Sequence, residues 1–163
     1  MSKLTKEHLK DLVKSECKFL GFNDVELIYA IIDVESGWNP FAVRYEPHWR
    51  YIVPVSNTML AKMGITKDTE EQLQKFSWGL MQIMGSVARE LNYTEILTKL
   101  VIPAENINVG IRKVMALAKK YKNIEDIIAS YNAGSPRKIS GKYVNQDYVD
   151  KVLVKYYEYK QNG

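Results

Sequence analysis

The sequence predicts a mainly α fold, a single helical domain with at most a small β element around residues 43–55. Three observations support this fold class. The chain has 163 residues, the length of one domain that can bury a hydrophobic core. Hydrophobic residues make up 46% and charged residues 26%, the proportions of a folded protein rather than a disordered one. Apolar residues recur at helical spacing along most of the chain.

The composition excludes several kinds of site and partner. The single cysteine, Cys17, rules out an internal disulfide and a multi-cysteine metal site, and the two histidines, His8 and His48, cannot form a His-Glu-x-x-His zinc motif. We therefore expect no metal and no cofactor. The net charge of +4 is spread along the chain and does not by itself decide between a nucleic-acid partner and an ordinary mixed-charge surface. Because the sequence shows no basic recognition face, we expect no nucleic acid as partner. No apolar run approaches the ~18 residues of a membrane span, and we expect no membrane insertion.

The first expected helix has apolar residues at helical spacing from Leu9 to Leu20, and Gly21 suits its C-terminal cap. Cys17 lies on this apolar stripe, which indicates packing rather than reactivity.

The second expected helix covers Val25–Val34, with Asp24 as its cap. It is apolar on most sides, so we expect it to be buried in the middle of the domain. The helix ends at Glu35-Ser36-Gly37, and Pro40 prevents its continuation.

Most of the remaining chain is expected to be helical. Residues 43–55 are the exception, because aromatic and β-branched residues there predict a short strand pair or an ordered loop. Pro103 suits the first position of the longest helix, and Asn123 can cap the one that follows. The expected helices are 57–63, 69–76, 86–91, 103–121, 124–131 and a last one that begins near residue 145.

Glu35 is the first candidate for chemistry. Burial at the end of an apolar helix raises the pKa of a carboxyl group, and the negative end of the helix dipole raises it again. A general acid needs this arrangement to hold its proton near neutral pH. The alternative is a glutamate that simply turns to solvent at a helix end.

Two further segments contain polar side chains that suit a ligand. Gln82 interrupts an apolar stretch, and its buried amide must bond either to the protein or to a ligand. Tyr131 and Asn132 precede Gly134, which is typical of a helix C-terminus. A hydroxyl and an amide beside aromatic faces would equally suit a sugar.

Five motifs follow one another along the chain: Glu-Ser-Gly-x-x-Pro-x-Ala (35–42), Gly-Leu-Met-Gln-Ile (79–83), Pro-x-x-Asn-Ile (103–107), Tyr-Asn-Ala-Gly (131–134) and Tyr-Val (148–149). In this order they resemble the soluble lytic transglycosylase family, whose members have a lysozyme-like fold and cleave peptidoglycan. The resemblance covers about residues 25–156 of a single expected domain, residues 1–163.

The resemblance also implies roles for individual residues. Glu35 matches the single catalytic acid/base of the family, and Ser36 matches the hydroxyl that hydrogen-bonds it. The expected partners are peptidoglycan glycan strands. Four residues match positions that line the sugar site or face the catalytic carboxylate and the N-acetyl group: Gln82, Met84, Tyr131 and Asn132.

The sequence also departs from the family pattern. Where many relatives have a short connection, this chain has a long inserted stretch, Arg44–Phe76, for which the sequence predicts no role. The usual alanine before Tyr-Asn is Ser130, and the small residues that often precede Gly-Leu-Met-Gln are Ser77 and Trp78, which would narrow or line the groove.

A single catalytic carboxylate implies a lytic transglycosylase that forms a 1,6-anhydromuramoyl product. The alternative is a lysozyme-type hydrolase, which needs a second carboxylate to activate water, and Glu46 is the candidate. A third interpretation is an inactive wall-binding or structural module. A small helical DNA-binding protein is a further class: a possible helix-turn-helix favours it, and the lack of a basic recognition face opposes it.

The location of the substrate raises the question of export. Peptidoglycan lies outside the cytoplasmic membrane, yet the first ten residues are charged and contain no apolar signal region. We therefore expect release by another route, as part of a bacteriophage particle or as a phage lysis enzyme, with virion or lysis proteins as partners. The alternative is a chain whose leader has been removed, and a signal peptide upstream in the native gene would contradict the phage interpretation.

Overall fold

The fold is mainly α, as predicted. The computed structural model describes residues 4–162, and within them lie eight α-helices, one short 3-10 helix and five short strands. The two ends of the expected domain 1–163, and the first three residues of the charged N-terminus, lie outside the described residues.

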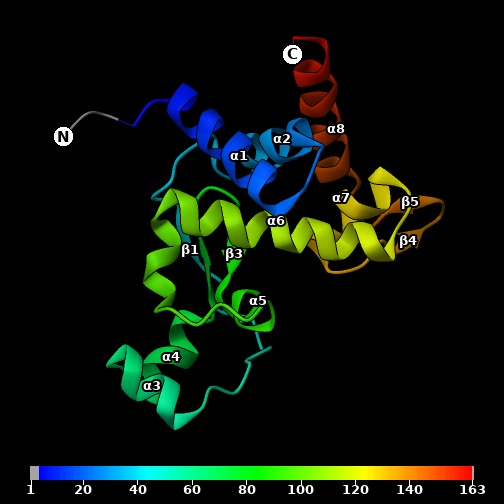
Figure 1. Cartoon of the computed structure of the whole chain (residues 1–163). Helices are drawn as coiled ribbons and strands as arrows, with labels where there is room; N and C mark the ends of the chain where they lie inside the picture. The colour runs from blue at the N-terminus through cyan, green and yellow to red at the C-terminus, as the bar shows by residue number, and fades with distance from the viewer. Residues whose placement is uncertain (1–3, 163) are drawn as a thin grey trace.

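Helix α2 (Val25–Ser36) forms the centre of the fold, as its apolar sequence predicts. The six consecutive residues 27–32 are all buried, which requires neighbours on several sides of the helix. Helices α1 (Lys6–Leu20) and α8 (Gln146–Gln161) supply this cover, and Figure 1 shows all three together at the top of the view. Cys17 is buried on α1, where burial raises the pKa of its thiol to about 12.

Helix α6 (Pro103–Lys120) is the longest helix and crosses the middle of the view in Figure 1. It packs against α1 and against α7 (Ile124–Ala133). Glycine at position 110 on α6 allows a close approach, because a Cβ atom there would overlap the sulfur and Cε of Met81. Helix α6 therefore lies directly against the chain around Met81.

A three-stranded antiparallel sheet contains the predicted β element. Strand β1 (Val43–Tyr45) lies in the expected region, whereas residues 46–55 contain no strand. Strand β1 pairs with β2 (Phe76–Trp78), which pairs in turn with β3 (Ile83–Met84). The partner of β1 is distant in the sequence, so the local pattern in 43–55 did not reveal it.

The other helices are present with shifted ends. The helix expected over 69–76 ends before residue 76, because Phe76 belongs to β2. A hairpin that the sequence did not predict precedes α8. The remaining elements are α3 (Asn57–Met63), α4 (Lys67–Leu73), α5 (Gly85–Glu90), the 3-10 helix η1 (Leu97–Val101), β4 (Lys138–Ile139) and β5 (Lys142–Tyr143).

Asp24 precedes α2 but does not cap it with its side chain, contrary to prediction. Its carboxylate instead accepts a hydrogen bond from the Tyr156 hydroxyl at 3.0 Å and pairs with the Lys160 ammonium at 2.9 Å. Both partners are on α8, so Asp24 joins the start of α2 to the last helix.

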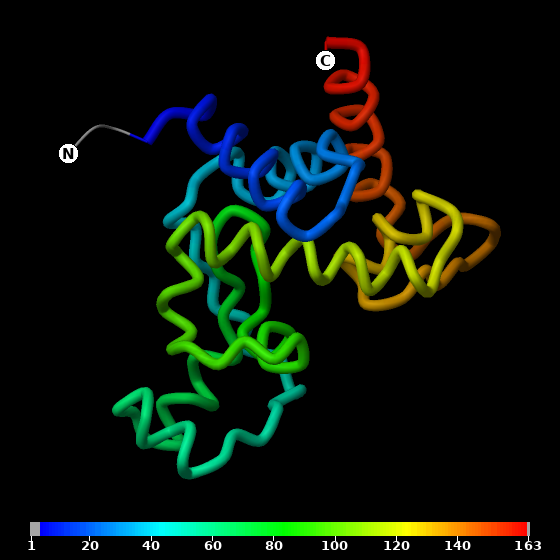
Figure 2. Tube along the Cα trace, in the orientation of Figure 1, coloured from blue at the N-terminus to red at the C-terminus, as the bar shows by residue number. Residues whose placement is uncertain are grey.

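The inserted stretch Arg44–Phe76 contains α3 and α4. Figure 2 traces it away from α1 and α8 and back to the sheet. Its buried residues include Leu60, Glu70 and Gln74, and two of these three are polar. Polar interactions therefore contribute much of what holds this stretch to the rest of the protein.

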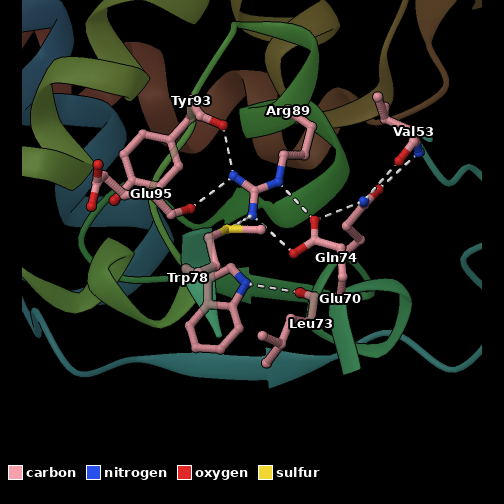
Figure 3. A network of polar contacts seen from close by, with 9 residues as sticks. Val53, Glu70, Leu73, Gln74, Trp78, Arg89, Tyr93 and Glu95 are labelled. Carbon is pink, nitrogen blue, oxygen red and sulfur yellow. Dashed lines mark hydrogen bonds and ion pairs between the residues drawn. The ribbon is translucent and has the colours of Figure 1, made fainter. Parts of the chain in front are cut away.

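A buried ion pair fixes the inserted stretch to α5 (Figure 3). Arg89 donates from Nε and Nη2 to the two carboxylate oxygens of Glu70 at 2.7 and 2.9 Å. Its Nη1 donates to the carbonyls of Tyr93 and Glu95 at 2.6 and 2.8 Å, and its Nη2 also contacts the sulfur of Met63. All five guanidinium hydrogens thus have acceptors, which allows the charge to stay buried.

Among residues 4–162, none of the helices combines the length and the apolar character that a membrane span requires.

Replacing Arg89 by alanine should lower the free energy of unfolding by about 3–5 kcal/mol, because Glu70 would remain buried without its cation. As a control, Lys155→Ala breaks an exposed ion pair with Glu158 and should cost less than about 1 kcal/mol. Urea unfolding followed by circular dichroism measures both values. Equal costs for the two variants would show that the buried pair does not stabilise the fold.

Candidate active site

Glu35 lies in the last turn of α2, which ends at Gly37 in a left-handed conformation (φ 58°). Its partly buried side chain lines a cavity of about 410 Å³. Burial raises the pKa of Glu35 and outweighs a hydrogen bond from Tyr148 and the positive charges of Lys113 and Arg44, which lower it. A carboxyl with a raised pKa that faces a cavity can donate a proton to a bound ligand.

Tyr148 on α8 is the hydrogen-bond partner of this carboxyl. Its hydroxyl donates to Oε1 of Glu35 at 2.6 Å. Burial and the charge of Glu35 raise the pKa of Tyr148 well above its ordinary value, so the phenol keeps its proton and remains a donor. The sequence contained Tyr148 in the last of the five motifs but suggested no role for it.

Ser36 has a different partner from the one that the resemblance implied. Its hydroxyl donates to the carbonyl oxygen of Leu80 at 2.7 Å and lies 3.2 Å from that of Ile32. A hydroxyl has one hydrogen, so this contact uses the donor that was expected for Glu35. Ser36 therefore anchors the loop formed by residues 79–82.

Asn106 on α6 holds the same loop from another side and explains the Pro-x-x-Asn-Ile motif. Its buried amide accepts from the Met81 N–H at 2.8 Å and donates to the carbonyls of Trp78 and Leu100 at 2.7 and 2.9 Å. Position 79 has a φ of 68°, and a Cβ there would lie 2.5 Å from Asn106 Nδ2. Glycine is thus required both by the conformation and by the close approach of Asn106.

Gln82 ends the loop in a left-handed conformation (φ 47°) that side-chain-bearing residues rarely adopt. Its Nε2 donates to the carbonyls of Gly79 and Ala42 at 2.9 and 3.0 Å, and its Oε1 accepts from the Ser77 hydroxyl at 2.9 Å. These bonds hold the strained residue in place. Gln82 also lines the cavity of Glu35. Both hydrogens of its Nε2 are used within the protein, so its Oε1 is the amide atom that can form a further hydrogen bond with a ligand.

Tyr131 and Asn132, at the end of α7, line the same cavity, as does Met84. The buried Tyr131 donates from its hydroxyl to the Met81 carbonyl at 2.7 Å, so it is a third anchor of the loop. Asn132 is exposed, and its Oδ1 accepts from Asn145 at 2.9 Å. This orientation leaves the Nδ2 donors of Asn132 for a ligand.

Lys113 is a charged residue of the site for which the sequence suggested no role. It lines the cavity, and its ammonium lies 3.8 Å from the centre of the Tyr131 ring and donates to the Tyr131 carbonyl at 2.8 Å. Burial lowers the pKa of Lys113 to about 8, against the opposing effect of Glu35. The available signal was its spacing, because Lys113 follows Asn106 by two helical turns on α6 and so shares its face.

The inserted stretch supplies another part of the cavity lining. Glu46 lines the cavity with Glu35, and its carboxylate pairs with the guanidinium of Arg44 at 2.5 Å. His48 and Trp49 also line it. The cavity therefore contains both predicted carboxylates and two residues to which the sequence assigned no role.

Within residues 4–162, no three His, Cys, Asp or Glu side chains lie close enough together to bind a metal ion.

Comparison with known proteins agrees with the order of the motifs. The family model of the transglycosylase SLT domain matches residues 22–152, which include all five motifs. Searches of the curated proteins and of the solved structures found no significant match. Domains of this family cleave glycosidic bonds in peptidoglycan. The chain belongs to the transglycosylase SLT domain family.

Proposed function

We propose that the protein is a peptidoglycan lytic transglycosylase that cleaves the β-1,4 bond between N-acetylmuramic acid and N-acetylglucosamine, with Glu35 as its only general acid and base. The environment of Glu35 supports this proposal most directly. Its carboxyl faces the cavity at the end of a buried helix, burial raises its pKa, and Tyr148 orients it. Gln82, Met84, Tyr131 and Asn132 line the cavity as candidate sugar contacts.

In the proposed reaction, protonated Glu35 donates its proton to the glycosidic oxygen as the bond from that oxygen to C1 of the muramic acid breaks. The carbonyl oxygen of the 2-acetamido group stabilises the positive charge at C1. Ionised Glu35 then takes the proton of the C6 hydroxyl, whose oxygen attacks C1 and closes the 1,6-anhydro ring. A nucleophile on the same sugar has a large effective-concentration advantage over water.

A two-carboxylate hydrolase is the second candidate function. It is favoured by one observation, since Glu46 lines the same cavity as Glu35 and could activate a water molecule. The ion pair with Arg44 opposes this role, because the guanidinium already occupies the carboxylate that would have to accept a proton from water.

Replacing Glu35 by glutamine should lower wall-clearing activity by at least ~10²–10⁴-fold, because one residue serves both proton transfers. Replacing Glu46 by glutamine should cost far less and leave the products unchanged. Mass spectrometry of muropeptides from purified peptidoglycan distinguishes the two reactions, because an anhydro end is lighter than a reducing end by one water.

Mostly reducing ends from the wild type, together with an inactive Glu46→Gln variant, would establish the hydrolase instead. Unchanged behaviour of Glu35→Gln would indicate a wall-binding module.

Replacing Lys113 by methionine should shift the alkaline limb of the pH profile of kcat/KM to higher pH. Glu35 must be protonated to act as the acid, so activity falls as the pH rises through its pKa. The positive charge of Lys113 lowers that pKa, and its removal lets the pKa rise.

Lys120→Met is the matched control, because Lys120 is an exposed lysine of the same helix whose ammonium lies over the ring of Tyr121. A limb that stays in place, or moves equally in both variants, would rule out the effect of Lys113.

A further inference from the structure

The segment that follows β1 forms a wall of the Glu35 cavity. His48 and Trp49, both from the inserted stretch, line the cavity together with Glu35. His48 is exposed and Trp49 is partly buried, so both can contact a bound molecule. We call residues 48–53 the insertion wall; His48 and Trp49 are its cavity-lining residues, and residues 50–53 connect them to the side chain of Gln74.

Hydrogen bonds fix Trp49 to the body of the protein. Its indole Nε1 lies 2.9 Å from the hydroxyl of Ser86 and 2.8 Å from the carbonyl oxygen of Tyr51. Ser86 is fully buried on α5, between Met84 and Val87, which also line the cavity. The polar edge of the indole is therefore turned to the protein, and its apolar surface is what remains for a ligand.

The rest of the insertion wall is held by the buried ionic network (Figure 3). The amide of Gln74 accepts from the Val53 N–H at 2.8 Å and donates to the Val53 carbonyl at 2.9 Å, as a paired strand would. The same amide donates to Glu70 at 2.9 Å, and Glu70 is paired with Arg89. The wall is therefore connected to α4 and α5 through side chains that are almost fully buried, and these contacts hold it in place.

The chemistry of this part of the cavity suits a sugar. Trp49, Met84 and Val87 present apolar atoms, and the imidazole of His48 can donate or accept a hydrogen bond. A pyranose ring has apolar faces bordered by hydroxyl groups, which match such a mixture. The lining is continuous with Glu35, so a glycan strand bound for cleavage would extend along it.

We propose that the insertion wall forms an additional sugar subsite, with Trp49 as its apolar platform and His48 as its polar contact. The proposal rests on the proposed function, because it takes the glycan strand that is cleaved at Glu35 as its ligand. Its occupant is a sugar residue beyond the two that the cleaved bond joins. The inserted stretch would thus make the enzyme prefer long glycan strands to short ones.

Binding without turnover tests this subsite. In the Glu35→Gln background, calorimetry measures the affinity for the trimer and the hexamer of β-1,4-linked N-acetylglucosamine. Adding Trp49→Ala should weaken hexamer binding about tenfold, the effect of losing a well-packed aromatic contact, and should reduce the preference for hexamer over trimer. Adding His48→Ala instead should weaken hexamer binding about fivefold, the effect of one hydrogen bond.

Two controls accompany the test. Tyr157→Ala removes an exposed aromatic residue of α8 and should leave both affinities unchanged. Trp49→Phe keeps the aromatic ring without the indole N–H and should bind the hexamer better than Trp49→Ala does. His48→Ala changes an exposed residue, so it still tests the subsite if Trp49→Ala fails to fold.

The possible outcomes separate this inference from the proposed function. If Glu35→Gln binds neither oligosaccharide nor purified peptidoglycan, the proposed function fails as well. If Glu35→Gln binds the hexamer and the Trp49 and His48 changes do not weaken it, the subsite is refuted while the function stands. Weakened binding of peptide-bearing strands alone would assign the wall to the stem peptide and overturn the sugar subsite.

Discussion

The backbone of the loop at residues 79–82 is the constraint on which the site depends. This loop enters the interior, where an unpaired N–H or C=O group costs about 1–3 kcal/mol. Three helices supply its partners, through Ser36 on α2, Asn106 on α6 and Tyr131 on α7. The loop in turn fixes the ends of these helices relative to one another, and the cavity forms between them.

This arrangement explains why the motifs occur together. Four of the five contribute a residue to the loop or an anchor for it, and the fifth contributes Tyr148, which bonds Glu35. Glu35 precedes the anchor Ser36 by one residue, so the bond from Ser36 to Leu80 also determines where the carboxyl lies. Residues that the resemblance linked to sugar binding, such as Gln82 and Tyr131, therefore also have a structural role.

The sequence predicted local features better than contacts between distant residues. The buried helix at α2 and the helix over 57–63 followed from hydrophobic periodicity and end signals, which are local properties. Other features depend on the tertiary fold: the pairing of β1 with β2, the partner of Ser36 and the position of Lys113 in the cavity. The contacts of the inserted stretch were hidden for the same reason, because Glu70 and Arg89 meet only when the chain folds.

We propose that the anchored loop and its helices bury Glu35 enough for its carboxyl to serve as an acid. The most direct measurement is the pKa of Glu35 in the wild-type protein, obtained from a carbon-13 NMR titration of the side-chain carboxyls, with Glu35→Gln to assign the signal. We expect a value above the ordinary value of 4.5, because burial outweighs the nearby cations and the bond from Tyr148. A pKa at or below 4.5 would contradict it.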